Sequence, residues 1–264
     1  MNKVIRAEFG RTINAGLIIA IAGIIFSICF DSFNDLIAGL RNGQEYVGYF
    51  FSNAAFGGMC THYMLPVFTA LPFSVSLCQE RNNKAVSYIV SREGKNRYIF
   101  AKFIVSAISG GFVAVCGTVL LFLMLAMRFP IAGDEFEGAV VSDYFHEWSA
   151  VYYPQLYILT LSILAFCRGV IWSSLALCVS LYTSDFMVVL LSPFLGSYVL
   201  VRIFQIIRVP DMVRPDMILI GQVVIKSSGL TLLIAIAISL TIVTLIGAFF
   251  VGKMKEGLKS GTIY

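Results

Sequence analysis

The run FIVSAISGGFVAVCGTVLLFLMLAM, from Phe103 to Met127, contains no acidic or basic side chain. An α-helix rises about 1.5 Å per residue, so roughly 20 apolar residues cross the hydrocarbon core of a bilayer, which is about 30 Å thick. The run exceeds that length. It therefore predicts a transmembrane helix.

Other runs along the chain have the same character. Of the 264 residues, 58% are apolar (AVILMFWYC) and 13% are charged, and the mean hydropathy is +0.86. These values favour a hydrocarbon environment over water. We expect an all-α, polytopic membrane protein, with one transmembrane domain over residues 1–264 and six transmembrane helices. The predicted spans are Ile13–Phe30, Ala54–Leu77, Phe103–Met127, Tyr157–Leu181, Phe186–Gln205 and Gly229–Val251. The first span is short, and its alternative interpretation is a cleaved signal peptide.

Basic residues fall mainly in every second polar segment. Because Lys and Arg accumulate on the cytoplasmic side of membrane proteins, these segments are predicted to be cytoplasmic, together with both termini. The inner basic residues are then Lys3, Arg6, Arg11, Arg81, Lys84, Arg92, Lys95, Arg97, Lys102, Lys253, Lys255 and Lys259. The net charge of +4 is explained by inner loops that face an anionic leaflet. We therefore expect a multi-pass protein of the inner (plasma) membrane, surrounded by lipid and without a nucleic-acid partner.

Small side chains recur at every fourth residue in two spans, a pattern that lets helices approach closely in lipid. The members are Ser106, Gly110, Ala114 and Thr118 in the third span and Ala235, Ser239, Val243 and Gly247 in the sixth. These stripes are interpreted as packing surfaces, which face either another span or a second subunit.

Prolines and cysteines give weaker signals. Pro66 and Pro72 are expected to bend the second span, and Pro193 to interrupt the fifth, because proline removes a backbone donor. The six cysteines contain no CxxC pair and are interpreted as packing residues. A disulfide between Cys29 and Cys60, both toward the outer face, is the alternative.

Two polar side chains within the spans are candidate pathway-lining residues, Arg168 and His62. An arginine near the middle of a bilayer costs at least about 3 kcal/mol unless it is paired or hydrated. In one interpretation, Arg168 snorkels or bonds to carbonyls of a neighbouring helix. In the other, it lines a cavity and meets an anionic or polar group of a substrate. For His62 the alternatives are a hydrogen-bonded helix residue and a ligand.

The sequence lacks the usual residue sets of membrane enzymes. The only histidines are His62 and His146, so there is no His-Glu-x-x-His zinc motif, and no G-x-S-x-G turn places a nucleophilic serine. The segment Gly247–Lys253 fits the start of a phosphate-binding loop, but Met254 stands where that loop needs Ser or Thr. We predict no catalytic residue, no metal site and no cofactor bound by this chain.

The most organised polar segment is CQERNNKAVSYIVSREGKNRYIFAK, Cys78–Lys102, between the second and third spans. Val86, Ile89 and Val90 share one face of a predicted helix. The residues Ser91-Arg92-Glu93-Gly94 are expected to end that helix. Its apolar face must rest on the membrane surface, on its own bundle or on a partner protein.

In this segment the chain resembles the ABC-2-type permease family, the membrane subunits of bacterial ABC exporters. The elements that carry the resemblance are Glu80-Arg81 at the membrane exit, the amphipathic stretch Ala85–Val90, Ser91-Arg92 and Lys102. The order of these elements and the six-span topology agree with the family. The sequence departs from the common form at Asn82-Asn83-Lys84 and at Val90, where an acidic residue with a Gly-Thr pair and a proline are frequent.

The resemblance implies a mechanism as well as a fold. Ala85–Val90 would be a coupling helix that docks into a separate P-loop ATPase subunit, and that partner would hold the ATP and Mg. The docking residues carried over are Glu80, Arg81, Ala85, Val86, Ile89, Val90, Ser91 and Arg92. Asn2–Asn14, with Ile5, Phe9 and Ile13 at helical spacing, would be an interfacial elbow helix. A second permease copy, identical or related, would complete a homo- or heterodimer.

The expected function is thus outward movement of a substrate, driven by ATP hydrolysis in the partner. The outer loops are too small to form a capture domain for large glycans, and we favour antimicrobial-peptide or amphiphile export, including self-immunity. The alternatives are an integral membrane enzyme and a non-transporting membrane scaffold or sensor. An enzyme needs a convergent polar constellation within the spans. A scaffold would use the same charged loop to bind a regulator.

Overall fold

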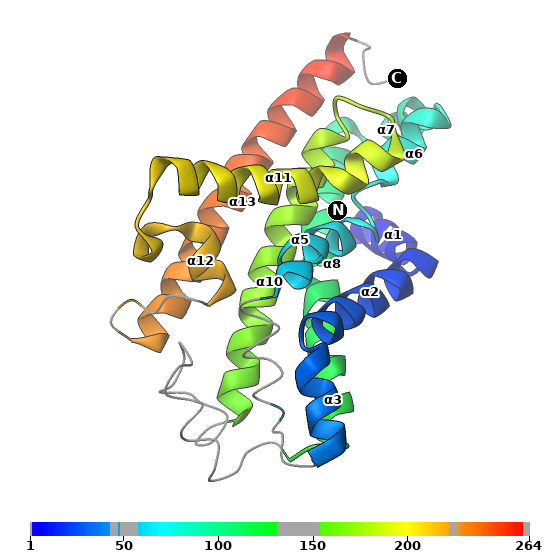
Figure 1. Ribbon diagram of the computed structural model, residues 1–264. Coiled ribbons are helices and arrows are strands. Elements are labelled where there is room, and N and C mark those ends of the chain that lie inside the picture. The colour runs from blue at the N-terminus through cyan, green and yellow to red at the C-terminus, as the bar shows by residue number, and fades with distance from the viewer. Residues whose placement is uncertain are drawn as a thin grey trace.

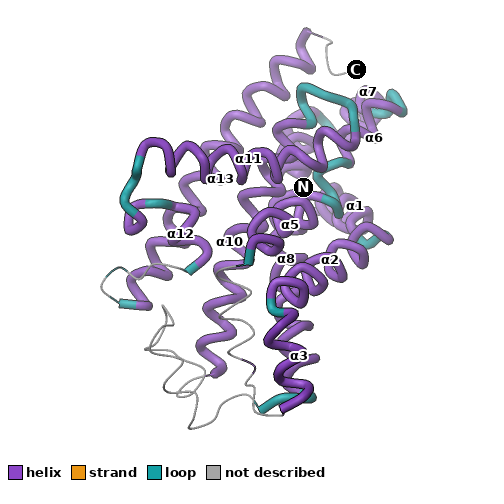
Figure 2. The backbone as a smooth tube through the Cα atoms, in the orientation of Figure 1, coloured by secondary structure: helices purple, strands orange, loops and turns teal. Residues whose placement is uncertain are grey.

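The computed structural model describes residues 2–42, 47, 58–130, 154–221, 225 and 227–260. Within these ranges all regular elements are helical (Figure 2). Their bounds are α1 Asn2–Thr12, α2 Ala15–Asp31, α3 Phe33–Asn42, α5 Met59–Ala70, α6 Ser76–Asn82, α7 Val86–Glu93, α8 Lys95–Ala126, α10 Pro154–Val179, α11 Phe186–Ile207, the short 3-10 helix η3 Asp211–Val213, α12 Pro215–Ile220 and α13 Ser228–Ser260.

Four of the described helices are long and apolar enough to cross a membrane: α8, α10, α11 and α13. A fifth span results if Val4–Thr12 and Ala15–Asp31 count as one segment, bent by 56° between α1 and α2. The expectation of an all-helical, membrane-embedded chain is confirmed at this level. Six spans and the interfacial position of the N-terminal helix stay predictions. The bounds of α8 and α13 reach well beyond the apolar runs, to Lys95 and Ser260.

The second predicted span is divided into two short helices. Helix α5 contains Pro66 and ends at Ala70, and α6 begins at Ser76 after a turn that includes Pro72. Neither helix is long enough to cross a bilayer alone. The predicted start of this span, at Ala54, lies outside the described residues. In contrast, α11 continues through Pro193, so the expected interruption there is wrong.

Helix α10 is the centre of the bundle. It packs along α8 and also contacts α5, α11, α12 and α13, as Figure 1 shows for the crossing helices around it. The stripe on α8 faces α10, because a Cβ on Gly110 would collide with Ser173 and lie 2.7 Å from the carbonyl oxygen of Gly169. On α13, a Cβ on Gly247 would lie 2.9 Å from the Phe103 ring of α8. Both stripes therefore contact spans of the same chain.

One end of the bundle gathers the segments predicted to be cytoplasmic. Helices α6 and α7 lie toward the same end as the C-terminus in Figure 1. The Lys95 ammonium at the start of α8 donates a 2.9 Å hydrogen bond to the Lys255 carbonyl near the end of α13. We call this end the basic end, after the lysines and arginines named above. All six cysteines are free, including Cys29 and Cys60.

Candidate functional site

Helix α7 forms within the segment predicted to be amphipathic. It covers Val86–Glu93 and ends at Gly94, whose φ of +86° favours glycine because a side chain there is strained. The expected helix end is therefore confirmed at Gly94. The helix stands between α6 and α8 at the basic end, joined to each by only a few residues.

The apolar side of α7 rests on its own bundle. Val86 is fully buried, and Ile89 and Val90 are half-buried against the same group of side chains. That group includes Leu77, Tyr98, Leu177, Phe250 and Met254 from α6, α8, α10 and α13. Of the three supports that the sequence left open, the bundle is the one observed in this chain.

The opposite side of α7 and the turn before it are exposed. This outer face of α7 consists of Asn82, Asn83, Lys84, Ser87, Tyr88, Ser91 and Arg92. Tyr88 is the large side chain among them, and 68% of its surface is exposed. Tyrosine and arginine are both enriched at protein–protein interfaces, and Tyr88 and Arg92 lie on this face.

Beneath α7, a buried ion cluster joins three helices. The Lys102 ammonium on α8 has no exposed surface and lies 2.7 Å from Glu80 Oε1 on α6 and 3.0 Å from Glu8 Oε2 on α1. The Tyr98 hydroxyl donates a 2.6 Å hydrogen bond to Glu80 Oε2, and Arg11 pairs with both acids. The cluster therefore fastens α1 and α6 to the start of α8.

The charges of this cluster set the protonation of Glu80. Burial alone would raise the pKa of its carboxyl. The positive charge of Lys102, together with hydrogen bonds from Lys102, Tyr98 and Arg11, outweighs burial and holds that pKa below its ordinary value. Glu80 is therefore ionised at neutral pH, as the ion pairs require.

Of the eight predicted docking residues, five contact the chain's own interior: Glu80, Arg81, Val86, Ile89 and Val90. Glu80 belongs to the buried ion cluster, and Arg81 donates hydrogen bonds of 2.9 and 3.2 Å to the carbonyls of Ser180 and Leu181 at the end of α10. Ser91 and Arg92 lie on the outer face, whereas Val86 is buried. The docking assignment itself stays a prediction.

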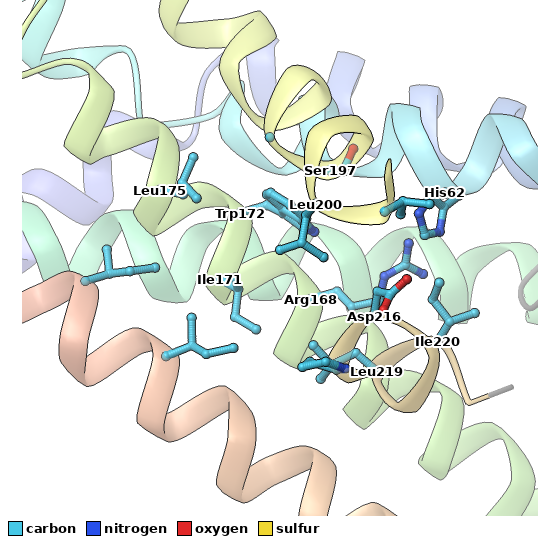
Figure 3. A pocket seen from close by; sticks show the side chains of 15 residues that line it. His62, Arg168, Ile171, Trp172, Leu175, Ser197, Leu200, Asp216, Leu219 and Ile220 are labelled. Carbon is cyan, nitrogen blue, oxygen red and sulfur yellow. The ribbon is translucent and has the colours of Figure 1, made fainter. Parts of the chain in front are cut away.

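The two polar residues singled out within the spans, Arg168 on α10 and His62 on α5, meet in one cavity. The cavity measures about 150 Å³ and is lined by α5, α10, α11, α12 and α13. Figure 3 shows the Arg168 side chain extending toward His62 and toward Asp216 of α12. The structure thus unites residues that are far apart in the sequence.

Asp216 does not neutralise Arg168, because it is paired with Arg214. The Arg214 Nη2–Asp216 Oδ2 distance is 2.7 Å, and Nε lies 3.3 Å from Oδ1. Among the described residues, the Arg168 guanidinium forms neither a hydrogen bond nor an ion pair, although only 8% of its surface is exposed. Bonding to the carbonyls of a neighbouring helix, the first interpretation of Arg168, is therefore not observed.

Sequence reasoning missed the partners that complete both sites. Glu8 gave one usable signal, because it is an acid on an otherwise basic N-terminal helix. Asp216 gave no such signal, since it stands among ordinary loop residues.

No group of three or more His, Cys, Asp or Glu side chains that could hold a metal ion occurs in the described parts of the chain. In comparisons with known proteins, no protein-family model, no curated protein and no solved structure matches the chain.

Proposed function

We propose that this chain is the permease subunit of an ATP-driven exporter and that the outer face of α7 docks a separate ATPase subunit. The observation that carries the proposal is the position of α7: a short helix between α6 and the long apolar helix α8, seated on the bundle by one side and exposed on the other. The resemblance of Cys78–Lys102 to the ABC-2-type permeases supports the same role.

The chemistry of the outer face suits a protein partner. Tyr and Arg are enriched among residues that dominate binding energy, and Tyr88 and Arg92 are both exposed here. Lys84 adds positive charge at the start of this surface. A complementary groove on the ATPase would therefore offer an apolar pocket and acidic side chains.

The attachment of α7 suits the transmission of force. Helix α7 contacts α8, and Val86 belongs to a buried group shared with α6, α10 and α13, so a displacement of α7 would be passed to α8 and through that group to its neighbours. The ion cluster fastens α6 and α1 to α8 in the same region. Closure of two ATPase subunits would thereby rock the spans of two permease copies and move substrate outward.

Co-purification of this chain with a separately encoded P-loop ATPase tests the proposal. Tyr88→Asp combined with Arg92→Glu should weaken that association roughly thirtyfold, which corresponds to the loss of a contact worth about 2 kcal/mol. These two positions are better probes than Val86 or Ile89, whose substitution also disturbs the core.

Arg41→Glu is the matched control, because Arg41 is exposed on α3. It should leave association and vanadate-sensitive ATP hydrolysis unchanged. If the double variant binds the ATPase as well as the unmodified chain, the docking surface is elsewhere. If a complex forms but neither hydrolyses ATP nor moves substrate, the scaffold or sensor function replaces the exporter.

A further inference from the structure

We infer that the cavity at Arg168 binds an amphiphile with one singly charged oxyanion head group, a carboxylate or a phosphodiester, and an apolar tail. The inference names a substrate class for the proposed exporter and rests on that proposal only for transport. Binding itself requires no ATPase.

The first argument is charge. Around the polar end of the cavity the buried charged side chains are Arg168, Arg214 and Asp216, while Asp211, the second partner of Arg214, is 69% exposed. Asp216 is matched by Arg214, so Arg168 has no counter-charge within the described residues. His62 supplies no negative charge in either protonation state. A buried guanidinium without an anion is costly, and an oxyanion matches its planar donors in a two-point contact.

The second argument is shape. From Arg168 the cavity continues along an apolar wall made by Ile171, Trp172, Leu175, Leu200, Ile242 and Ile246. Apart from Ile171, these side chains are half-buried, whereas Arg168 is buried. The Arg168 guanidinium is therefore enclosed, with the partly exposed residues His62 and Asp216 beside it, and the apolar end reaches the surface of α10, α11 and α13, three helices able to span a membrane. An amphiphile whose charged head lies at Arg168 and whose tail extends along the apolar wall toward lipid fits this arrangement.

The third argument is selectivity. Asp216 and His62 leave Arg168 as the single uncompensated charge, so a dianionic or cationic head is disfavoured. The volume of about 150 Å³ accepts a head group and a short part of one tail. Recognition would thus depend on charge and on one tail, with the remainder of the tail in the bilayer.

Tryptophan fluorescence offers a direct test, because Trp172 belongs to the apolar wall. The chain has two tryptophans, and Trp148→Phe leaves Trp172 as the only one. In neutral-lipid nanodiscs, a brominated fatty acid should quench Trp172 at concentrations at least about tenfold lower than the brominated alcohol of equal length, because only the acid pairs with Arg168.

Three variants test whether the preference for the acid over the alcohol depends on Arg168. Arg168→Gln should abolish it, Arg168→Lys, which keeps the charge but loses the two-point contact, should keep part of it, and Arg202→Gln, which removes an exposed arginine from α11, should leave it intact. Equal quenching by the acid and the alcohol in the unmodified chain, or an unchanged preference in Arg168→Gln, would overturn the inference. The acid–alcohol comparison needs no variant, so it stands even if Arg168→Gln fails to fold.

Adding phosphatidylglycerol to phosphatidylcholine nanodiscs identifies the source of the ligand. Competition by phosphatidylglycerol supports the oxyanion site with a bilayer lipid as its occupant. Absence of competition, with fatty-acid binding retained, supports a free single-tailed amphiphile. Failure of fatty-acid binding while the ATPase still docks would reject this inference and leave the proposed function standing.

Discussion

At the scale of single residues, Lys102 is the side chain whose environment differs most from that of an ordinary lysine. It is fully buried, and its charge is matched by Glu8 and Glu80. Removing one member of a buried ion pair leaves the other charges uncompensated, which usually destabilises a protein far more than loss of a surface pair. The basic end of this bundle should therefore depend on Lys102.

Lys102→Met should lower the free energy of unfolding by about 3 kcal/mol, because Glu8 and Glu80 would share only Arg11. Thermal unfolding in a mild detergent measures the change. Lys259→Met, at an exposed position of α13, should have almost no effect. A similar loss in both variants would mean that the buried ion pairs contribute nothing specific.

Glu80 gives a pH dependence with a defined sign. Its pKa is lower in the folded chain than in the unfolded chain, so its contribution to stability is present at neutral pH and is lost as the pH falls through the folded-state pKa. The difference in unfolding temperature between the unmodified chain and Glu80→Gln should therefore narrow on acidification from pH 7. A difference that stays constant or widens would contradict the assignment.

At the scale of elements, the contact between α8 and α10 depends on glycines at positions 110 and 169. A Cβ on Gly169 would lie 2.9 Å from the Cα of Gly111. Gly169→Leu should therefore force the helices apart and cost about 1–3 kcal/mol, measured as a lower unfolding temperature. Gly252→Leu on α13, where a Cβ meets nothing within 4 Å, is the matched control and should be tolerated.

The elements were predictable to different degrees. Long apolar runs predicted the helices α8, α10, α11 and α13, and for each of them at least one predicted end lies within a few residues of the observed end. Such runs are reliable because a segment in lipid must satisfy its backbone hydrogen bonds within itself, as a helix does. The division of the second span was harder to foresee, since the effect of Pro72 depends on the turn around it and Pro193 leaves α11 unbroken. The polar extensions of α8 and α13 were missed, because apolarity marks where a span crosses lipid and not where its helix ends.

The site was less predictable than the elements. Arg168 and His62 were recognisable as polar side chains in apolar runs, but their meeting depends on how α5 packs on α10. The pairing of Lys102 with Glu8 and Glu80 requires three helices to converge, and no local pattern encodes that convergence. Tertiary packing, and not local propensity, determined what sequence reasoning missed.

At the scale of the whole molecule, α7 and the end of α13 lie at one end of the bundle. The concentration of basic residues there predicts that this end faces the cytoplasm. Cysteines introduced as Arg92→Cys and Lys259→Cys should react with a membrane-impermeant maleimide only after the cells are permeabilised. Met212→Cys, in exposed η3, should react in intact cells. The unmodified chain corrects for its native thiols. Labelling of Arg92→Cys from outside would invert the arrangement.

The ion cluster also imposes an order on biosynthesis. Glu8 emerges from the ribosome early, whereas Lys102 follows 94 residues later. Until α8 has been inserted, Glu8 and Glu80 have Arg11 as their one basic partner in the cluster, and neither α1 nor α6 can be fastened to α8. A nascent chain truncated before Lys102 thus holds the two acids of the cluster against a single arginine.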